Sequence, residues 1–258
     1  MLTHANISCN TQQLRAWFPE MKDGKESLLA VFPFFHSVGW TGIQNLSILG
    51  GWTDILVPRP ESQVVIEIMG KYKPALLPAM PEVYSGLLAR EAFRKMDLSS
   101  VRGFLAGAAP LPSDAIKKIK TLKNGPVINS YGLTEISGMG TATPWGGPEK
   151  PGTVGVPLPG TDLKIVDRGT GTSELPAGEA GEICFKGPQV MKGYCNTPEK
   201  TAAAIKEGWL YTGDVGFLDD EGYLTILDRK EDLIEANGGS IYPTEIDEVL
   251  FTHPKVFE

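Results

Sequence analysis

The sequence lacks the residue patterns that mark several common classes of protein. Its 258 residues include three cysteines, Cys9, Cys184 and Cys195, with no C-x-x-C spacing, which argues against a zinc site or a disulfide framework and favours a reducing compartment. Neither G-x-x-x-x-G-K-[ST] nor G-x-G-x-x-G is present, so a P-loop kinase and a dinucleotide-binding dehydrogenase are poorly supported. Residues 168–173 look like a phosphate loop, but no lysine and no long helix follow them, and we predict a hairpin loop there.

Basic runs and a membrane-spanning segment are missing as well. The net charge is −7 and no long basic run occurs, which argues against a nucleic-acid partner. Residues 28–53 contain no charged side chain, but Pro33 and several glycines interrupt them, so we expect a buried strand and a buried helix there, not a transmembrane span. No signal peptide follows Met1, and we expect a cytoplasmic protein.

The pattern of apolar, glycine and proline residues changes near residue 150. Before it, short apolar runs alternate with amphipathic segments, which indicates alternating β and α units and a parallel sheet with helices packed on its faces. The expected strands are 28–32, 54–57, 75–77, 101–106 and 127–131, and the expected helices are 3–18, 39–49, 61–73, 81–89 and 113–122.

After residue 150, glycine and proline separate short β-rich runs, which favours a small antiparallel barrel or sandwich. The expected elements are strands at 154–156, 162–166 and 181–186, a helix at 198–206, short strands at 232–235 and 240–242, and a helix from Pro243. We therefore predict the α/β fold class in three parts: a layered α/β subdomain (1–150), a β-rich barrel-like subdomain (151–227), and the start of a small α+β domain (228–258).

A predicted hairpin holds the most informative pair of side chains. The run 210–218 turns through Asp219, Asp220, Glu221 and Gly222 into a second β-rich run. If Leu218 pairs with Tyr223, Asp214 lies opposite Leu227, and Arg229 is its diagonal neighbour on the same face. A carboxylate that only accepts and a guanidinium that only donates suit a sugar diol with a nearby phosphate. An ordinary surface ion pair is the alternative.

Two loops leave the expected carboxyl ends of parallel strands, where such sheets bind ligands. The loop 107–111 (GAAPL) has small residues that expose backbone and leave room for a flat ring, although a plain βα turn has the same composition. The loop 131–135 (YGLTE) offers a stacking face, a close backbone approach, a donor for phosphate oxygen in Thr134 and a Mg²⁺ ligand in Glu135. A capped helix start explains only Thr134 and Glu135.

His36 follows a strand and stands among aromatic residues. A histidine in that setting is more typical of a hydrogen-bonded core residue than of a general base, because nothing in the sequence orients or activates it. Lining an apolar acyl site is the better functional interpretation.

Together these strings resemble the adenylate-forming superfamily of acyl-CoA synthetases, acid:AMP ligases and luciferases. Within this superfamily, the residues of the longer strings are most like those of fatty-acyl-CoA ligases. The matching strings, in family order, are PFFH (33–36), GAAPL (107–111), YGLTE (131–135), GEICFKGPQVMKGY (181–194), YTGDVGFLDDEGYL (211–224), DRKEDLI (228–234) and IYPTEID (241–247).

The resemblance implies an ATP-dependent acid–thiol ligase. In the first half-reaction a carboxylate attacks the α-phosphorus of Mg·ATP and pyrophosphate leaves; in the second, the thiol of coenzyme A displaces AMP. The implied substrates are a fatty acid or a similar carboxylic acid, ATP with Mg²⁺, and coenzyme A. A lipid-like substrate makes peripheral membrane association plausible, although no basic amphipathic helix supports it.

The resemblance also assigns roles to individual residues. It implies catalytic roles for Thr134 at the α-phosphate, Glu135 at Mg²⁺ and His36 at the acyl pocket. The remaining assignments are Gly107, Ala108 and Ala109 at adenine, Tyr131 and Gly132 beside the base, Asp214 and Arg229 at the ribose, Trp40 at the mouth of the acyl tunnel, Glu231 at the hinge, and Gly238 on the pantetheine path.

Two parts of the family pattern are missing. A Gly-rich loop ending in Pro-Lys-Gly is expected just before Met1, and a lysine of the small domain beyond Glu258. We therefore expect an internal fragment that is close to inactive as a ligase, and we expect self-association through apolar sheet edges near 28–34. The alternatives are an adenylating ligase for aryl acids or for a carrier-protein acceptor, and a non-catalytic nucleotide-binding fragment.

Overall fold

Two β-sheets, each with its own hydrophobic core, make up most of the molecule. The computed structural model describes residues 1–107, 111–236, 239–251, 253 and 256. The seven-stranded sheet has the order β2-β1-β3-β4-β5-β6-β7, parallel as far as β5 and antiparallel beyond it. Its strands are β1 (Ser27–Ala30), β2 (Thr53–Leu56), β3 (Leu76–Ala79), β4 (Gly103–Ala106), β5 (Val127–Tyr131), β6 (Thr141–Ala142) and β7 (Val156–Pro157).

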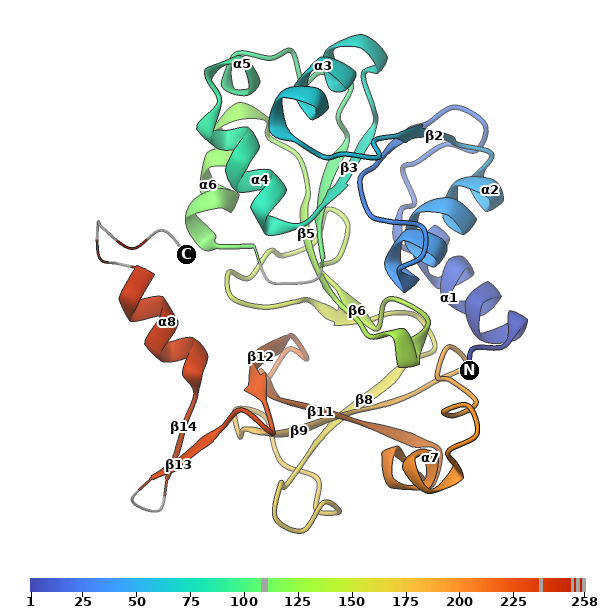
Figure 1. Ribbon diagram of the computed structural model, residues 1–258, viewed down its shortest axis with the longest axis vertical. Helices are drawn as coiled ribbons and strands as arrows, with labels where there is room; N and C mark the ends of the chain where they lie inside the picture. The colour runs from blue at the N-terminus through green and yellow to red at the C-terminus, as the bar shows by residue number, and fades with distance from the viewer. Residues whose placement is uncertain (108–110, 237–238, 252, 254–255, 257–258) are drawn as a thin grey trace.

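Helices cover both faces of this sheet, as its parallel part requires. Figure 1 shows α4, α5 and α6 on one side and α1 and α2 on the other. The predicted helix 39–49 is a π-helical segment continued by an α-helix; at Gly39 a Cβ atom would lie 2.1 Å from the Pro33 carbonyl oxygen, so only glycine fits this bend. The helices are α1 (His4–Trp17), η1 (Val38–Asn45), α2 (Leu46–Gly50), α3 (Ser62–Tyr72), α4 (Pro81–Ala89), α5 (Glu91–Arg94) and α6 (Ser113–Leu122).

The second sheet is antiparallel throughout, as predicted for the β-rich part. Strands β8 and β9 pair directly, which confirms that residues 168–173 belong to a hairpin loop. The predicted helix 198–206 ends at Ala204, because Ile205 and Lys206 pair with Leu210 and Trp209. The strands of this second sheet, with the helix between them, are β8 (Asp162–Val166), β9 (Gly181–Lys186), α7 (Pro198–Ala204), β10 (Ile205–Lys206), β11 (Trp209–Leu218) and β12 (Leu224–Arg229).

The chain closes with a short hairpin and a helix beside β12. These are β13 (Ile234–Ala236), β14 (Gly239–Ile241) and α8 (Pro243–Phe251). The predicted α/β class, with a parallel sheet followed by an antiparallel one, is confirmed. The boundaries proposed at residues 150 and 227 stay a prediction.

Helix α1 joins the two cores. Thr3 caps it as predicted, in a reciprocal arrangement with Asn6. The side chain of the buried Asn10 makes two hydrogen bonds with the Met139 backbone. Its Nδ2 atom donates to the Met139 carbonyl (2.7 Å), and its Oδ1 atom accepts from the Met139 backbone amide (3.2 Å). One turn on, Gln13 reaches Thr161 and Gln189 at the second sheet. A polar seam on α1 therefore fixes the two sheets to each other.

The exposed edge lies elsewhere than predicted. Residues 28–32 are buried, because β1 is an interior strand between β2 and β3. The edge strand next to β1 is β2, where Leu56 is 58% exposed. Ile48 and Leu49, which precede β2 in the chain, are exposed as well. Within the described part of the chain, no helix is long and apolar enough to cross a membrane.

The two hydrogen bonds between Asn10 and Met139 generate a stability prediction. We expect Asn10→Ala to lower the free energy of unfolding by about 2 kcal/mol, because it leaves both the amide and the carbonyl of Met139 buried without a partner. Urea titration followed by circular dichroism measures this loss. Gln12→Ala, on the exposed side of the same helix, is the matched control, and equal losses in the two variants would contradict the seam.

Candidate functional site

A cavity of about 340 Å³ lies where the two sheets meet. It brings together four residues that the sequence singled out: Tyr131 and Gly132 after β5, Asp214 on β11 and Arg229 at the end of β12. The other lining residues are Ser130, Leu133, Val154, Ile226, Leu227, Asp228 and Thr244.

Asp214 and Arg229 face each other directly. The Arg229 Nε atom lies 3.0 Å from Asp214 Oδ1, so the predicted closeness of the pair is confirmed. The predicted register is wrong: Leu218 pairs with Leu224, and Asp214 pairs with Arg229 instead of Leu227. Two features cause the difference, a longer loop and a bulge between the pairs formed by Val215 and Gly216.

The loop is longer because Asp219 builds a turn of its own. Its Oδ1 accepts from the amides of Glu221 and Tyr223, and its amide donates to the Tyr223 carbonyl. Tyr223 therefore belongs to the turn, and the ladder begins at Leu224.

The Asp214 carboxylate is buried, with 4% of the residue exposed. The Tyr131 hydroxyl donates a short hydrogen bond to Oδ2. Oδ1 accepts no hydrogen bond from the described residues, although it forms the ion pair with Arg229. One oxygen of this carboxylate thus has an ion-pair partner but no hydrogen bond from the described residues.

Burial dominates the electrostatics of this group. It raises the pKa of the Asp214 carboxyl, against the Tyr131 hydrogen bond and the Arg229 guanidinium, which lower it. Burial, followed by the charge of Asp214, raises the pKa of the Tyr131 phenol well above its ordinary value. Tyr131 therefore remains a donor at neutral pH, while holding Asp214 ionised costs free energy.

The fold itself requires glycine at position 132, which also lines the cavity. A Cβ atom at Gly132 would lie 1.8 Å from the Gly138 carbonyl oxygen, so the loops after β5 pack backbone against backbone. The expected close approach of a ligand to Gly132 stays a prediction. Gly107 lies one strand away, where Ser130, the residue before Tyr131, donates to the Ala106 carbonyl.

Thr134 and Glu135 lie just outside the cavity, in the 3₁₀ turn η2 (Thr134–Ile136). Tyr194 donates to Glu135 Oε1 (3.0 Å), and the Met191 amide donates to the Glu135 carbonyl (2.7 Å). Residues 188–194 thus hold Glu135 in place. The described residues contain no cluster of three metal-ligating side chains; a single carboxylate still fits Mg²⁺, which takes its remaining ligands from water and phosphate.

His36 is exposed, which rules out the alternative of a buried core histidine; its expected place at an acyl site stays a prediction. Its Nδ1 atom accepts from the Val38 amide (3.3 Å), and the next residue, Ser37, lies 3.5 Å from Thr134 between side-chain oxygens. The loops carrying His36 and Thr134 therefore meet. Trp40, on η1, is half exposed.

For four of the predicted residues, the structure does not test the proposed role. Ala108, Ala109 and Gly238 lie outside the described residues. Glu231 is exposed and makes a 3.5 Å ion pair with Arg229. The roles proposed for all four stay predictions.

Sequence reasoning missed Tyr194 and Thr244. Thr244, at the start of α8, donates to the Leu227 carbonyl (2.5 Å), and its amide donates to Asp228 (3.0 Å). The proline at position 243 signals a helix start, but nothing in the sequence places that start against β12. Tyr194 closes the 181–194 string and was visible only as part of that pattern.

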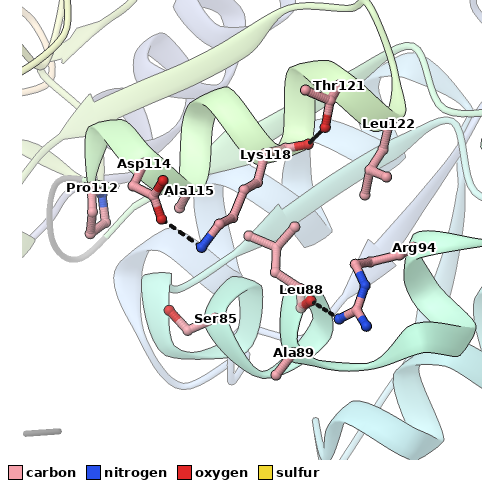
Figure 2. A pocket seen from close by; sticks show the side chains of 10 residues that line it. All are labelled: Ser85, Leu88, Ala89, Arg94, Pro112, Asp114, Ala115, Lys118, Thr121 and Leu122. Carbon is pink, nitrogen blue, oxygen red and sulfur yellow. Dashed lines mark hydrogen bonds and ion pairs between the residues drawn. The ribbon is translucent and has the colours of Figure 1, made fainter. Parts of the chain in front are cut away.

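A second cavity, of about 540 Å³, lies between α4 and α6 and is shown in Figure 2. Its charged groups are satisfied within the helices: Asp114 pairs with Lys118, and Arg94 donates to the Leu88 carbonyl. None of the residues that the sequence singled out line it, so we do not place the site there.

The sequence profile of AMP-binding enzymes matches residues 1–195. The chain belongs to the AMP-binding enzyme family.

Relatives of this chain are named for different acids. It is 44% identical to a long-chain-fatty-acid–CoA ligase of Bacillus subtilis (strain 168), over 100% of its own length but 46% of that relative. ATP-bound MatB from Rhodopseudomonas palustris superposes with a TM-score of 0.92 at 32% identity, covering 100% of this chain and 50% of that one. O-succinylbenzoate coenzyme A synthetase from Bacillus subtilis, in complex with ATP and magnesium ion, gives 0.88 at 32% identity, with 100% and 52% covered. The chain thus spans about half of each.

The raised pKa of Asp214 generates a second prediction. Because the folded state binds this proton more tightly than the unfolded chain, ionised Asp214 costs stability above its folded-state pKa, and the cost disappears as the pH falls through that pKa. We expect Asp214→Asn to be at least as stable as the wild type at neutral pH, with the difference shrinking on acidification.

Asp219→Asn is the control of opposite sign. The hydrogen bond from Lys150 lowers the pKa of Asp219, so its carboxylate adds stability at neutral pH that is lost as the pH falls through that lowered pKa. Thermal unfolding of both variants from neutral pH down to below the ordinary Asp pKa makes the measurement. A clear loss of stability in Asp214→Asn at neutral pH would contradict the sign.

Proposed function

We propose that this chain carries the adenosine-binding part of an ATP-dependent acid–thiol ligase whose acid substrate is a fatty acid. The observation that carries the proposal is the buried Asp214 carboxylate, whose Oδ1 accepts no hydrogen bond from the described residues while lining a cavity beside Arg229 and Tyr131. A carboxylate oxygen can accept from more than one donor, so ribose hydroxyls can bond to Asp214 in addition to its ion pair with Arg229.

Each residue of the cavity has a part in holding the nucleotide. Asp214 accepts from the ribose hydroxyls, and Arg229 donates to ribose or phosphate oxygens. Tyr131, backed by Phe185 with ring centroids 6.0 Å apart, presents an aromatic surface to the adenine, and Gly107, Ala108 and Ala109 form the other side of that slot. In this arrangement adenosine lies between the two sheets, with its phosphates directed toward Thr134.

The residues around η2 fit Mg²⁺ and the α-phosphate. Glu135 would hold Mg²⁺, which would supply positive charge to the phosphates. The protein's own contribution is to hold Glu135 with the Tyr194 hydroxyl and to place the exposed Thr134 hydroxyl beside the loop of His36. His36 and Trp40 then line the acyl side, Gly238 the pantetheine path, and Glu231 the hinge between the large and small domains.

The fatty acid is the substrate that the 44% identity to the Bacillus subtilis ligase supports. An aryl acid is the second candidate, because the O-succinylbenzoate enzyme superposes on the whole chain. Comparing fatty and aryl acids in an adenylation assay on the protein joined to its flanking sequences separates the two.

Nucleotide binding by the chain itself tests the core of the proposal. We expect AMP to bind, and Asp214→Ala to weaken it about 10- to 100-fold, the effect of losing hydrogen bonds to a charged acceptor. Isothermal titration calorimetry gives both dissociation constants. Asp220→Ala, an exposed residue of the same hairpin, should bind like the wild type. A wild-type chain that does not bind AMP would overturn the proposed function.

The metal role of Glu135 needs its own test. We expect Glu135→Gln to weaken Mn²⁺ binding about tenfold in the presence of a non-hydrolysable ATP analogue, because the amide keeps the shape but removes the charge. Electron paramagnetic resonance of free Mn²⁺ gives the affinity. Glu199→Gln, exposed on α7, is the control. Unchanged Mn²⁺ affinity in Glu135→Gln would assign this side chain to positioning the turn.

A further inference from the structure

Strand β11 is irregular just where it carries Asp214. Opposite β9, Tyr211 pairs with Cys184 and Val215 pairs with Glu182. Thr212, Gly213 and Asp214 therefore stand opposite Ile183 alone. Such a bulge bends a strand and re-aims its side chains, and here the re-aimed side chain is the Asp214 carboxylate. The bulge also removes regular ladder partners from the amides within it.

Side chains replace those lost partners. The Gly213 amide donates to Glu182 Oε1 (3.2 Å), and the Asp214 amide donates to the Thr212 hydroxyl oxygen (3.0 Å), which itself donates to the Ile183 carbonyl (2.8 Å). Gly213 has φ of +77°, a conformation that glycine adopts without strain. The shape of the bulge therefore depends on Glu182 as well as on local turn residues.

Glu182 also reaches the other strand of the hairpin. Its side chain is 8% exposed, and its Oε2 atom lies 2.8 Å from Lys230 Nζ. The Lys230 amide in turn donates to the Gly213 carbonyl (2.7 Å). Glu182 is thus bonded to the residue before Asp214 and to the residue after Arg229. One buried carboxylate links the backbone positions next to both members of the ion pair.

We propose that Glu182 is a positioning residue for the ribose: it holds the β11 bulge against Lys230 so that Asp214 and Arg229 present a fixed pair of groups to the two ribose hydroxyls. This inference rests on the proposed function. Glu182 does not line the nucleotide cavity, so its effect must pass through the bulge. Glu182→Gln keeps the shape and an acceptor for the Gly213 amide but loses the ion pair, whereas Glu182→Ala loses both contacts.

The test measures ribose selectivity, which general destabilisation does not change. Calorimetry gives the dissociation constants of AMP and of 2′,3′-dideoxy-AMP, which lacks both hydroxyls, and their ratio is the selectivity. We expect a wild-type ratio of about 10 to 100, from hydrogen bonds to a charged acceptor. In Glu182→Ala the ratio should fall to within about threefold of one, with an intermediate ratio in Glu182→Gln.

Two further variants keep the result interpretable. Lys230→Met removes the ammonium group from a half-exposed position and should lower the ratio at least threefold, even if Glu182→Ala does not fold. Leu87→Ala, which removes a fully buried side chain of α4, should be destabilised without touching the bulge and should keep the wild-type ratio. A wild-type protein without ribose selectivity would refute the proposed function. A selective wild type whose ratio survives in both Glu182→Gln and Lys230→Met would refute the role of Glu182 alone.

Discussion

The contact between Tyr131 and Asp214 is the interaction on which the site depends. Tyr131 ends the last parallel strand of the seven-stranded sheet, and Asp214 belongs to the five-stranded sheet, so this one hydrogen bond joins the two sheets across the cavity. The position of the cavity then follows from general rules. Parallel strands place their carboxyl ends at one edge, and the α1 seam holds the second sheet against that edge.

The hairpin shows why a wrong register can still predict the right pair. We expected Asp214 opposite Leu227, and it lies opposite Arg229, two residues further along. The longer turn and the bulge each contribute one residue. Because side chains alternate across a strand, a shift of two residues returns the same face. Asp214 and Arg229 therefore moved from diagonal to direct neighbours without leaving the cavity. The individual residues of a turn decide such shifts, and no periodicity reports them.

Other parts of the site could not be predicted, because distant segments supply them. Strand and helix patterns place Tyr131, Glu135 and Asp214 at the ends or bends of their elements, since these patterns are local. The hydroxyl that holds Glu135 comes from Tyr194, 59 residues later. Nothing in the sequence indicates that the Gly138 backbone packs against Gly132 and leaves no room for a Cβ atom there. Contacts of this kind depend on tertiary packing, which overrides the local signal.

Asp214 and Glu182 show how one hairpin divides its electrostatic tasks. Both carboxylates are buried, but Glu182 is satisfied by Lys230 and the Gly213 amide, whereas Oδ1 of Asp214 lacks a hydrogen bond from the described residues and burial raises the pKa of this carboxyl. A fully satisfied buried group rigidifies its surroundings. A buried group that lacks a hydrogen bond favours the binding of a ligand that supplies the missing donor. In the role proposed for Glu182, this rigidity acts together with the direct contacts from Tyr131 and Arg229 to keep the Asp214 carboxylate at the cavity.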